Sequence, residues 1–300
     1  MKKPIISKLF LYRHRYKIGY FLLAVAFIFL LFALPSAAPN GLSQAEQESA
    51  IISHNTSWDT ITNGDFIDAP YHFLQKFSIN LLGLTPYGIK LPSIIIGAIL
   101  GFLIILLLNR WFKNNVAIIA SILTVLSSNF LYLAGSGTPL IMLVFWPTFL
   151  LWLGSKIQGV NRPKPFYCFV FALALLLSVF TPYMLYLAIF IVIYAFVHPH
   201  LRFTIKNLPK APFIFAIIIG IAGLDIIFYN LITHHSELSA LLWGSDLSIA
   251  KFFSNLQAGF SPFISWSGSV ESTLLSPLIG LASFALAITG LISKIGRAHV

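Results

Sequence analysis

Long apolar stretches recur along the chain, and no other feature limits its possible folds as strongly. A helix needs roughly 20 mostly apolar residues to cross the hydrocarbon core of a bilayer, which is about 30 Å thick. Hydrophobic residues make up 58% of the sequence and charged residues only 9%, whereas about a quarter of the residues in a soluble domain are charged. The sequence therefore predicts an all-α, polytopic membrane protein. Its expected spans are residues 18–34, 91–108, 116–133, 140–153, 166–180, 183–197, 212–232 and 274–292.

One boundary among these spans rests on a proline and on charge. Residues 166–197 form an apolar stretch that suits either one overlong helix or two short ones. Thr181-Pro182 falls in its middle, where proline removes a backbone donor and clashes with the preceding turn. The next connection, residues 198–211, is basic, and only two crossings return it to the basic side of the membrane. We therefore expect two short helices here and about eight spans in all.

The basic residues are distributed along the chain as expected for the connections on one side of a membrane. The formal net charge is +10, which by itself fits a nucleic-acid partner, but the basic residues gather between apolar stretches as the positive-inside rule describes. With a cytoplasmic N-terminus, every Lys and Arg except Lys76, Lys90 and Lys251 lies inside, and every acid except Asp225 lies outside. This distribution argues against nucleic acid as a partner and predicts a transmembrane domain over residues 18–293.

Two long connections are expected on the exterior, at about residues 35–89 and 233–273, and exposed loops are where an enzyme of this kind would carry its chemistry. A basic cytoplasmic N-terminus, residues 1–17, precedes the first span. A cleaved signal peptide is the alternative for that span. A retained signal anchor fits better, because the apolar run exceeds the roughly 7–15 residues of a signal core.

The first exterior loop carries two acids soon after the first span. Ser43 and Glu46 have the spacing of a capping box, in which a hydroxyl and a carboxylate each satisfy a free N–H at the start of a helix. That structural role is one interpretation of Glu46. The other makes Glu46 or Glu48 a general base, which takes a proton from an incoming hydroxyl group at the membrane surface.

A second helix is predicted later in the same loop. Pro70 suits a first helical turn, and apolar residues recur at helical spacing from Phe73 to Leu82, with polar residues on the other face. The segment is too short to span and is expected to lie in the outer interface. Lys76 and His72 would then stand at headgroup height and bind a phosphate, although a lysine that only extends toward the interface is the commoner case.

Two further acids are candidates for function. Asp225 is the one acid within an expected span, and acids there are functional candidates because their insertion costs free energy; a substrate contact and a structural hydrogen bond are both open for it. Asp68, just before the interfacial helix, is likewise a substrate or structural acid. His234 and His235 lack the ligand spacing of a metal site. No metal site and no cofactor is assigned, and dependence on a divalent metal stays open.

Four short segments follow one another in an order that resembles a known family. They are Ala45-Glu46, Asp68-Ala69-Pro70-Tyr71, Leu81-Leu82-Gly83-Leu84 and Lys90-Leu91-Pro92-Ser93. The GT-C glycosyltransferases, which include protein O-mannosyltransferase-like and aminoarabinose-transferase-like enzymes, carry similar motifs after their first span. Their loop aspartate is Ala45 in this chain, their lysine is Asp68, and a second acid is absent from residues 135–139.

The resemblance implies a GT-C-like helix bundle in a prokaryotic plasma membrane. The implied enzyme moves a sugar from a polyprenyl phosphate or diphosphate to an exterior glycan, lipid or protein, with inversion. Glu46 or Glu48 would be the base, and Lys76, Lys90 and His72 would bind the donor phosphate. The alternatives are a transporter or flippase for lipid-linked or small substrates, and a non-catalytic protein on the same scaffold, which the departures from the motifs favour.

Residues 294–300, KIGRAHV, resemble the translation of a common short-read sequencing adapter. We expect this heptapeptide to be an artefact at the end of a truncated fragment, since GT-C enzymes typically have more spans than eight. A short basic cytoplasmic tail is the alternative.

Overall fold

The computed structural model describes residues 10–37, 41–57, 66–157, 164–199, 202, 210–233 and 241. Within these residues every regular element is a helix and no strand occurs, in agreement with the all-α prediction. The eighth expected span, residues 274–292, lies outside the described residues, as do residues 294–300 and nearly all of the second exterior loop. Two compact units make up the chain.

The first unit combines α1 (Phe10–Ala37), α6 (Asn114–Val125) and α7 (Ser128–Gly135) with the end of α5. α1 packs against α6 and α7. The rings of Phe27 and Phe130 meet there with their centroids 5.7 Å apart. α1 begins within the basic segment 1–17, so the helix starts before the apolar run does.

The structure differs from the sequence prediction at residues 116–133, where α6 and α7 replace one expected helix. Ser127 lies at the interruption. Its hydroxyl donates to the carbonyl of Thr124 at 2.8 Å and accepts the N–H of Phe130 at 3.3 Å. The serine thus satisfies backbone groups of both helix ends, and serine is a preferred residue for capping a helix start.

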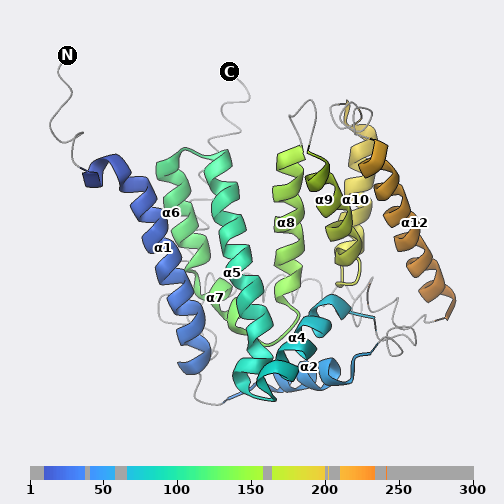
Figure 1. Ribbon diagram of the computed structural model, residues 1–300, viewed down its shortest axis with the longest axis horizontal. Helices are drawn as coiled ribbons and strands as arrows, with labels where there is room; N and C mark the ends of the chain where they lie inside the picture. The colour runs from blue at the N-terminus through green and yellow to red at the C-terminus, as the bar shows by residue number, and fades with distance from the viewer. Residues whose placement is uncertain are drawn as a thin grey trace, which may run out of the picture. The chain divides into compact units, whose positions relative to one another are not determined.

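The second unit holds the start of α5 (Pro86–Trp111) and four helices that run side by side in Figure 1, namely α8 (Ile141–Ile157), α9 (Pro165–Ser178), α10 (Met184–Val197) and α12 (Lys210–Thr233). α9 contacts α8, α10 and α12, and Phe169 stacks on Phe215 with centroids 4.3 Å apart. The turn that contains Pro182 separates α9 from α10, so the prediction of two short helices is confirmed.

Among the described residues, two helices are long and apolar enough to cross a membrane, over Tyr16–Ala33 in α1 and Pro86–Trp111 in α5. The other apolar stretches within described helices are shorter, at 10–17 residues. Large apolar side chains are exposed along them, above all on α10 and α12, and soluble proteins rarely leave such a continuous apolar surface open. The helices fit a membrane protein, while the total of eight spans stays a prediction.

Two helices of the segment between α1 and α5, which is the predicted first exterior loop, are α2 (Gln44–Asn55) and α4 (Ala69–Leu82), and they pack against each other within the second unit. Hydrogen bonds to residues 137 and 180 place them beside the start of α8 and the end of α9 (Figure 1). Gly83 ends α4 with a φ of 74°, a left-handed conformation that suits glycine. The predicted helix starts at Ser43 and Pro70 are confirmed.

The polarity of α4 is the reverse of that on a soluble protein. Its buried face carries Tyr71, His72, Gln75 and Ser78 together with Ile79, whereas four of its other large apolar side chains, Leu74, Phe77, Leu81 and Leu82, are exposed. Those open side chains include Leu74, Phe77 and Leu81, at 48%, 65% and 66% exposure. An open apolar face above a buried polar face suits a helix that lies in a lipid interface, and the interfacial position stays a prediction.

Candidate functional site

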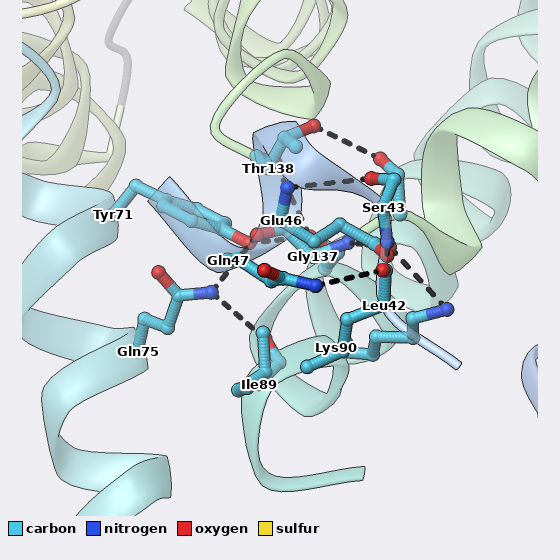
Figure 2. Close-up of polar contacts among 12 residues, drawn as sticks. Leu42, Ser43, Glu46, Gln47, Tyr71, Gln75, Ile89, Lys90, Gly137 and Thr138 are labelled. Atoms are coloured by element: carbon cyan, nitrogen blue, oxygen red, sulfur yellow. Dashed lines mark hydrogen bonds and ion pairs between the residues drawn. The ribbon is translucent and has the colours of Figure 1, made fainter. Parts of the chain in front are cut away.

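Glu46 stands in the first turn of α2 and is 5% exposed. Its Oε2 accepts the N–H of Ser43 at 2.8 Å and the hydroxyl of Ser43 accepts the N–H of Glu46 at 3.3 Å, so the predicted capping box is present. Oε1 accepts the N–H of Gly137 at 2.8 Å and lies 3.3 Å from Nζ of Lys90 (Figure 2). Both oxygens of Glu46 are thus engaged, and its charge is paired with a buried lysine.

Gln75 is the centre of this polar region and is fully buried. Its Nε2 donates to the carbonyls of Ile89 and Gly137, each at 2.9 Å (Figure 2). Its Oε1 accepts the hydroxyls of Ser49 and Ser53. A primary amide has two donors and two acceptor lone pairs, so every hydrogen-bonding position is used. One side chain thereby joins α2, α4, α5 and the turn before α8.

α5 begins at Pro86, five residues before the predicted start of the span, so the motif Lys90-Leu91-Pro92-Ser93 lies inside the helix, where it binds α5 to α4. Pro92 has no N–H, so the carbonyl of Gly88, four residues earlier, loses its helical donor. The hydroxyl of Ser78 on α4 supplies a donor at 2.6 Å. Ser93, the residue after Pro92, is also buried, and its hydroxyl lies 2.7 Å from the hydroxyl of Tyr71 on α4. The proline and the serine of the motif therefore both bind α4.

His72 is held neutral within the same network. Its Nδ1 lies 2.7 Å from the hydroxyl of Ser53, and Ser53 gives its own hydrogen to Gln75, so Nδ1 carries the proton of this contact and Nε2 of the neutral ring has none. Burial lowers the pKa of His72 to about 4, because desolvation disfavours the imidazolium. His72 would therefore have to take up a proton before it could donate to a phosphate through Nε2.

Asp68 forms a second acidic centre at the start of α4. Its N–H donates to the carbonyl of Phe180 at 2.8 Å, and its carboxylate accepts the hydroxyl of Thr181. Thr181 accepts Nε1–H of Trp146 at 3.1 Å. Burial raises the pKa of Asp68 to about 7, and the bond from Thr181 opposes part of that rise.

Tyr71 lies close to both acidic centres. It is fully buried. Burial is the largest cause that raises the pKa of Tyr71, the hydrogen bond with Ser93 opposes the rise, and the charges of Glu46 and Asp68 add to it. A neutral phenol near both carboxylates therefore makes the two centres parts of one buried polar region.

The structure brings a predicted base and a predicted phosphate ligand together and places a second predicted ligand elsewhere. Glu46 and Lys90 form the ion pair, whereas Nζ of Lys76 donates to the carbonyl of Thr56, just after α2. Between Glu46 and Thr56 the chain rises about 15 Å along the helix axis, at about 1.5 Å for each residue. Lys76 and Lys90 therefore stand near opposite ends of α2.

The two remaining predicted acids lie outside the buried region. Glu48 is exposed and accepts a hydrogen bond from Nε2 of Gln44 at 3.0 Å. Asp225 is exposed on α12. Within the described residues, neither acid joins the network around Gln75.

Sequence reasoning missed four residues of the region: Ser53, Gln75, Gly137 and Thr181. Gln75 was placed on the polar face of α4, which was expected to face headgroups and is instead buried. In the sequence, the segment around Gly137 differs from the family pattern only in lacking an acid. In the structure, its backbone supplies the contacts to Glu46 and Gln75. A backbone contact over such sequence separations leaves no local pattern in the sequence.

Comparison with known proteins adds one result. The sequence model of a family described as dolichyl-phosphate-mannose-protein mannosyltransferase matches residues 70–227, just over half of the chain. The match covers Gln75, Lys90 and Thr181 but begins after Glu46 and Asp68. Searches among curated proteins and among solved structures returned no match.

Proposed function

The chain belongs to the dolichyl-phosphate-mannose-protein mannosyltransferase family, a family of membrane glycosyltransferases that use lipid-linked sugars, and on that premise we propose a specific reaction for it. A sugar moves from a polyprenyl phosphate or diphosphate to a hydroxyl group on the exterior side, with inversion at the anomeric carbon. A carboxylate of the first exterior loop takes the acceptor proton. The chemistry takes place where this loop meets the start of α5.

The observation that carries the proposal is the buried pair of Lys90 and Glu46, 3.3 Å apart at the first turns of α5 and α2. As the sugar leaves its donor, the phosphate oxygen gains negative charge, and a cation already in place stabilises that charge without reorganisation. Lys90 is such a cation. For Glu46 to act as the base, the donor phosphate would first have to draw Lys90 away from it. Glu48, exposed on the same helix, is the other base predicted from the sequence.

Lys76 and His72 take different places in this proposal. Because Lys76 stands at the far end of α2, it suits a second contact with an anionic headgroup better than the phosphate at Lys90. His72 reaches the phosphate as a donor only after protonation. The open apolar stripe of α4, with Phe77 and Leu81, would hold the loop at the depth where a lipid-linked sugar presents its phosphate.

Transfer from defined donors tests the proposal. The full chain in proteoliposomes is given polyprenyl-phosphate mannose, glucose or aminoarabinose, with serine- and threonine-rich peptides and lipid-linked glycans as acceptors. We expect the wild type to transfer at least one sugar. We expect the double variant Glu46→Gln/Lys90→Met, which removes the charge pair without leaving a lone buried charge, to lose that transfer.

Two other outcomes separate the alternatives. Movement of the donor lipid between leaflets without transfer would favour a flippase, and no reaction with any donor would favour a non-catalytic protein. Undiminished transfer by the double variant would remove Lys90 and Glu46 from the site while leaving the enzyme class intact.

A further inference from the structure

Asp68 has an oxygen without a partner in a buried position. The residue is 8% exposed, and within the described part of the chain its Oδ1 has no hydrogen-bond partner. Buried polar atoms nearly always have partners, and each exception calls for a cause such as a catalytic role or a missing ligand. The side chain does not cap its own helix either, although it occupies the N-cap position of α4. This carboxylate therefore does not cap the N-terminus of α4, which is the usual role of an aspartate at this position.

A chain of hydrogen bonds orients the other oxygen of the carboxylate. The indole N–H of Trp146 can only donate, so Thr181 receives it and must use its own hydrogen elsewhere. That hydrogen goes to Asp68. Thr181 therefore holds the carboxylate as an acceptor on one side and leaves the buried Oδ1 without a hydrogen-bond partner among the described residues.

Backbone strain marks the same turn. Asp68 has a φ of 52° and Tyr183 a φ of 64°, the two non-glycine residues with positive φ in the described residues. Asp68 donates its N–H to Phe180, at the start of the turn that ends with Tyr183. Left-handed backbone is costly for a bulky side chain and gathers at functional sites, where the surroundings enforce it. The residues with left-handed backbone and the unpartnered oxygen of Asp68 thus lie at the same place, where the start of α4 contacts the turn between α9 and α10.

Three of the five acids of the first loop lie in described residues, namely Glu46, Glu48 and Asp68, and they differ in what a base requires. Glu46 uses both oxygens and is paired with Lys90. Glu48 is exposed and accepts a hydrogen bond from Nε2 of Gln44. Asp68 is buried, faces no ion-pair partner in the described residues, and has a free lone pair on an oriented carboxylate. Of these three acids, Asp68 is the one that is buried and can also accept a proton without first breaking an ion pair.

We propose that Asp68 is the general base of the sugar transfer and receives the acceptor's hydroxyl proton on Oδ1 while Thr181 holds its other oxygen. The inference rests on the proposed function above. The acceptor oxygen bonds to the anomeric carbon, the bond from that carbon to the phosphate oxygen breaks, and its electron pair leaves with the polyprenyl phosphate. The proton of the hydroxyl ends on Asp68, which then releases it to water.

The titration of Asp68 agrees with this assignment. A base works best when its pKa lies near the working pH, and burial raises the pKa of Asp68 to about 7. Two titratable residues of α4 lie beside it in the described part of the chain: Tyr71, whose pKa the charge of Asp68 helps to raise, and His72, whose backbone N–H donates to the Asp68 carbonyl at 3.1 Å. Burial raises the pKa of Tyr71 and lowers that of His72, so both side chains are neutral near pH 7. The activity should therefore fall as the pH drops through about 7.

Steady-state kinetics of two variants test the inference. The full chain in proteoliposomes is assayed with the donor that the wild type uses. Asp68→Asn keeps the shape and should lower kcat by about 100-fold or more, the usual contribution of a general base, with the KM for the donor within about twofold. Thr181→Val removes the bond that lowers the pKa of Asp68, so the acidic limb of its pH–rate profile should move to higher pH.

Each outcome has a defined meaning. Thermal unfolding in detergent should show Asp68→Asn to be at least as stable as the wild type, since a buried neutral amide replaces a titrating acid. Normal kcat in this variant, or a rise in KM alone, overturns the inference and leaves the enzyme class standing. A loss of transfer confined to Glu46→Gln would return the role to Glu46. No transfer by the wild type overturns the proposed function and this inference together.

Discussion

The amide N–H of Gly137 donates to Oε1 of Glu46 at 2.8 Å, across 91 positions of sequence. The carbonyl of the same glycine accepts Nε2 of Gln75. One peptide segment before α8 is thus held from both sides by α2 and α4. The segment that carries α2 and α4 is therefore part of the folded unit and not a separate appendage.

Gly137→Ala should destabilise the protein. A Cβ at this position would lie 2.9 Å from Cγ2 of Ile89 and 3.5 Å from Cγ of Glu46, so the turn would have to shift, at a cost of about 1–3 kcal/mol for overpacking. Gly220→Ala is the matched control, because its Cβ meets nothing within 4 Å. Thermal unfolding in detergent measures both; equal melting temperatures for the two variants would contradict the prediction.

Gln75→Leu should destabilise the protein further. The leucine leaves two carbonyls and two serine hydroxyls of the buried network without their partner, and each buried unsatisfied group costs about 1–3 kcal/mol. Gln47→Leu is the control, since Gln47 is exposed and donates to the carbonyl of Leu42. Denaturant unfolding in micelles should separate the two variants clearly, and a similar small loss in both would mean that the network adds little.

Lys90→Met should cost about 3–5 kcal/mol, the range for removing one partner of a buried ion pair. The cost arises because Glu46 stays buried without its cation. Adding Glu46→Gln should restore most of the loss, and a double-mutant cycle of unfolding free energies measures the coupling. Lys76→Met, which removes a half-buried lysine bonded to one carbonyl, should cost less than Lys90→Met.

His72 should make the protein sensitive to acid. Its pKa is lowered from 6.5 to about 4 in the folded state, so between these values the unfolded chain binds a proton that the folded chain does not, and stability falls as the pH decreases from 6.5 to 4. His72→Asn keeps a donor toward Ser53 and removes the titration. Unfolding free energies measured from pH 7 to pH 4 should fall less steeply for this variant, and parallel curves would refute the assignment.

The open stripe of α4 should lie in lipid. Cys168 is the single cysteine of the sequence, so a Cys168→Ser background allows one spin label at a chosen site. A label at Phe77→Cys should collide more with oxygen than with a water-soluble nickel complex, and a label at Asn80→Cys should show the opposite preference. Equal accessibility at both positions would contradict the interfacial placement.

Short-range sequence patterns allowed much of the α2 and α4 helices to be predicted. The capping box at Ser43 and Glu46, the helix that follows Asp68, and the break at Pro182 all depend on chemistry within a few residues. Periodicity also separated the two faces of α4, but it carries no information about which face is covered. The burial of Gln75 and His72 follows from packing against α2 and α5, which local patterns do not describe.

The candidate site was harder to predict for a related reason. Glu46 and Lys90 were both named from the motifs, yet their pairing joins residues that are 44 positions apart, from 46 to 90. The contact of Asp68 with Thr181 joins still more distant segments. Ser127 is a local feature that the prediction also missed. Its hydroxyl binds backbone groups on both sides of a break between two helices, in a stretch that was predicted as one apolar span.

Pro92 has a consequence for the geometry of the α4–α5 hairpin as a whole. Because the Gly88 carbonyl depends on Ser78 for its donor, sliding α4 by one residue would move that hydroxyl by about 1.5 Å and turn it about 100° around its axis. The carbonyl would then be stranded. The missing N–H of one proline therefore sets the register between the two helices. That register also fixes how deeply the apolar stripe of α4, with Phe77 and Leu81, can insert into one leaflet of the membrane.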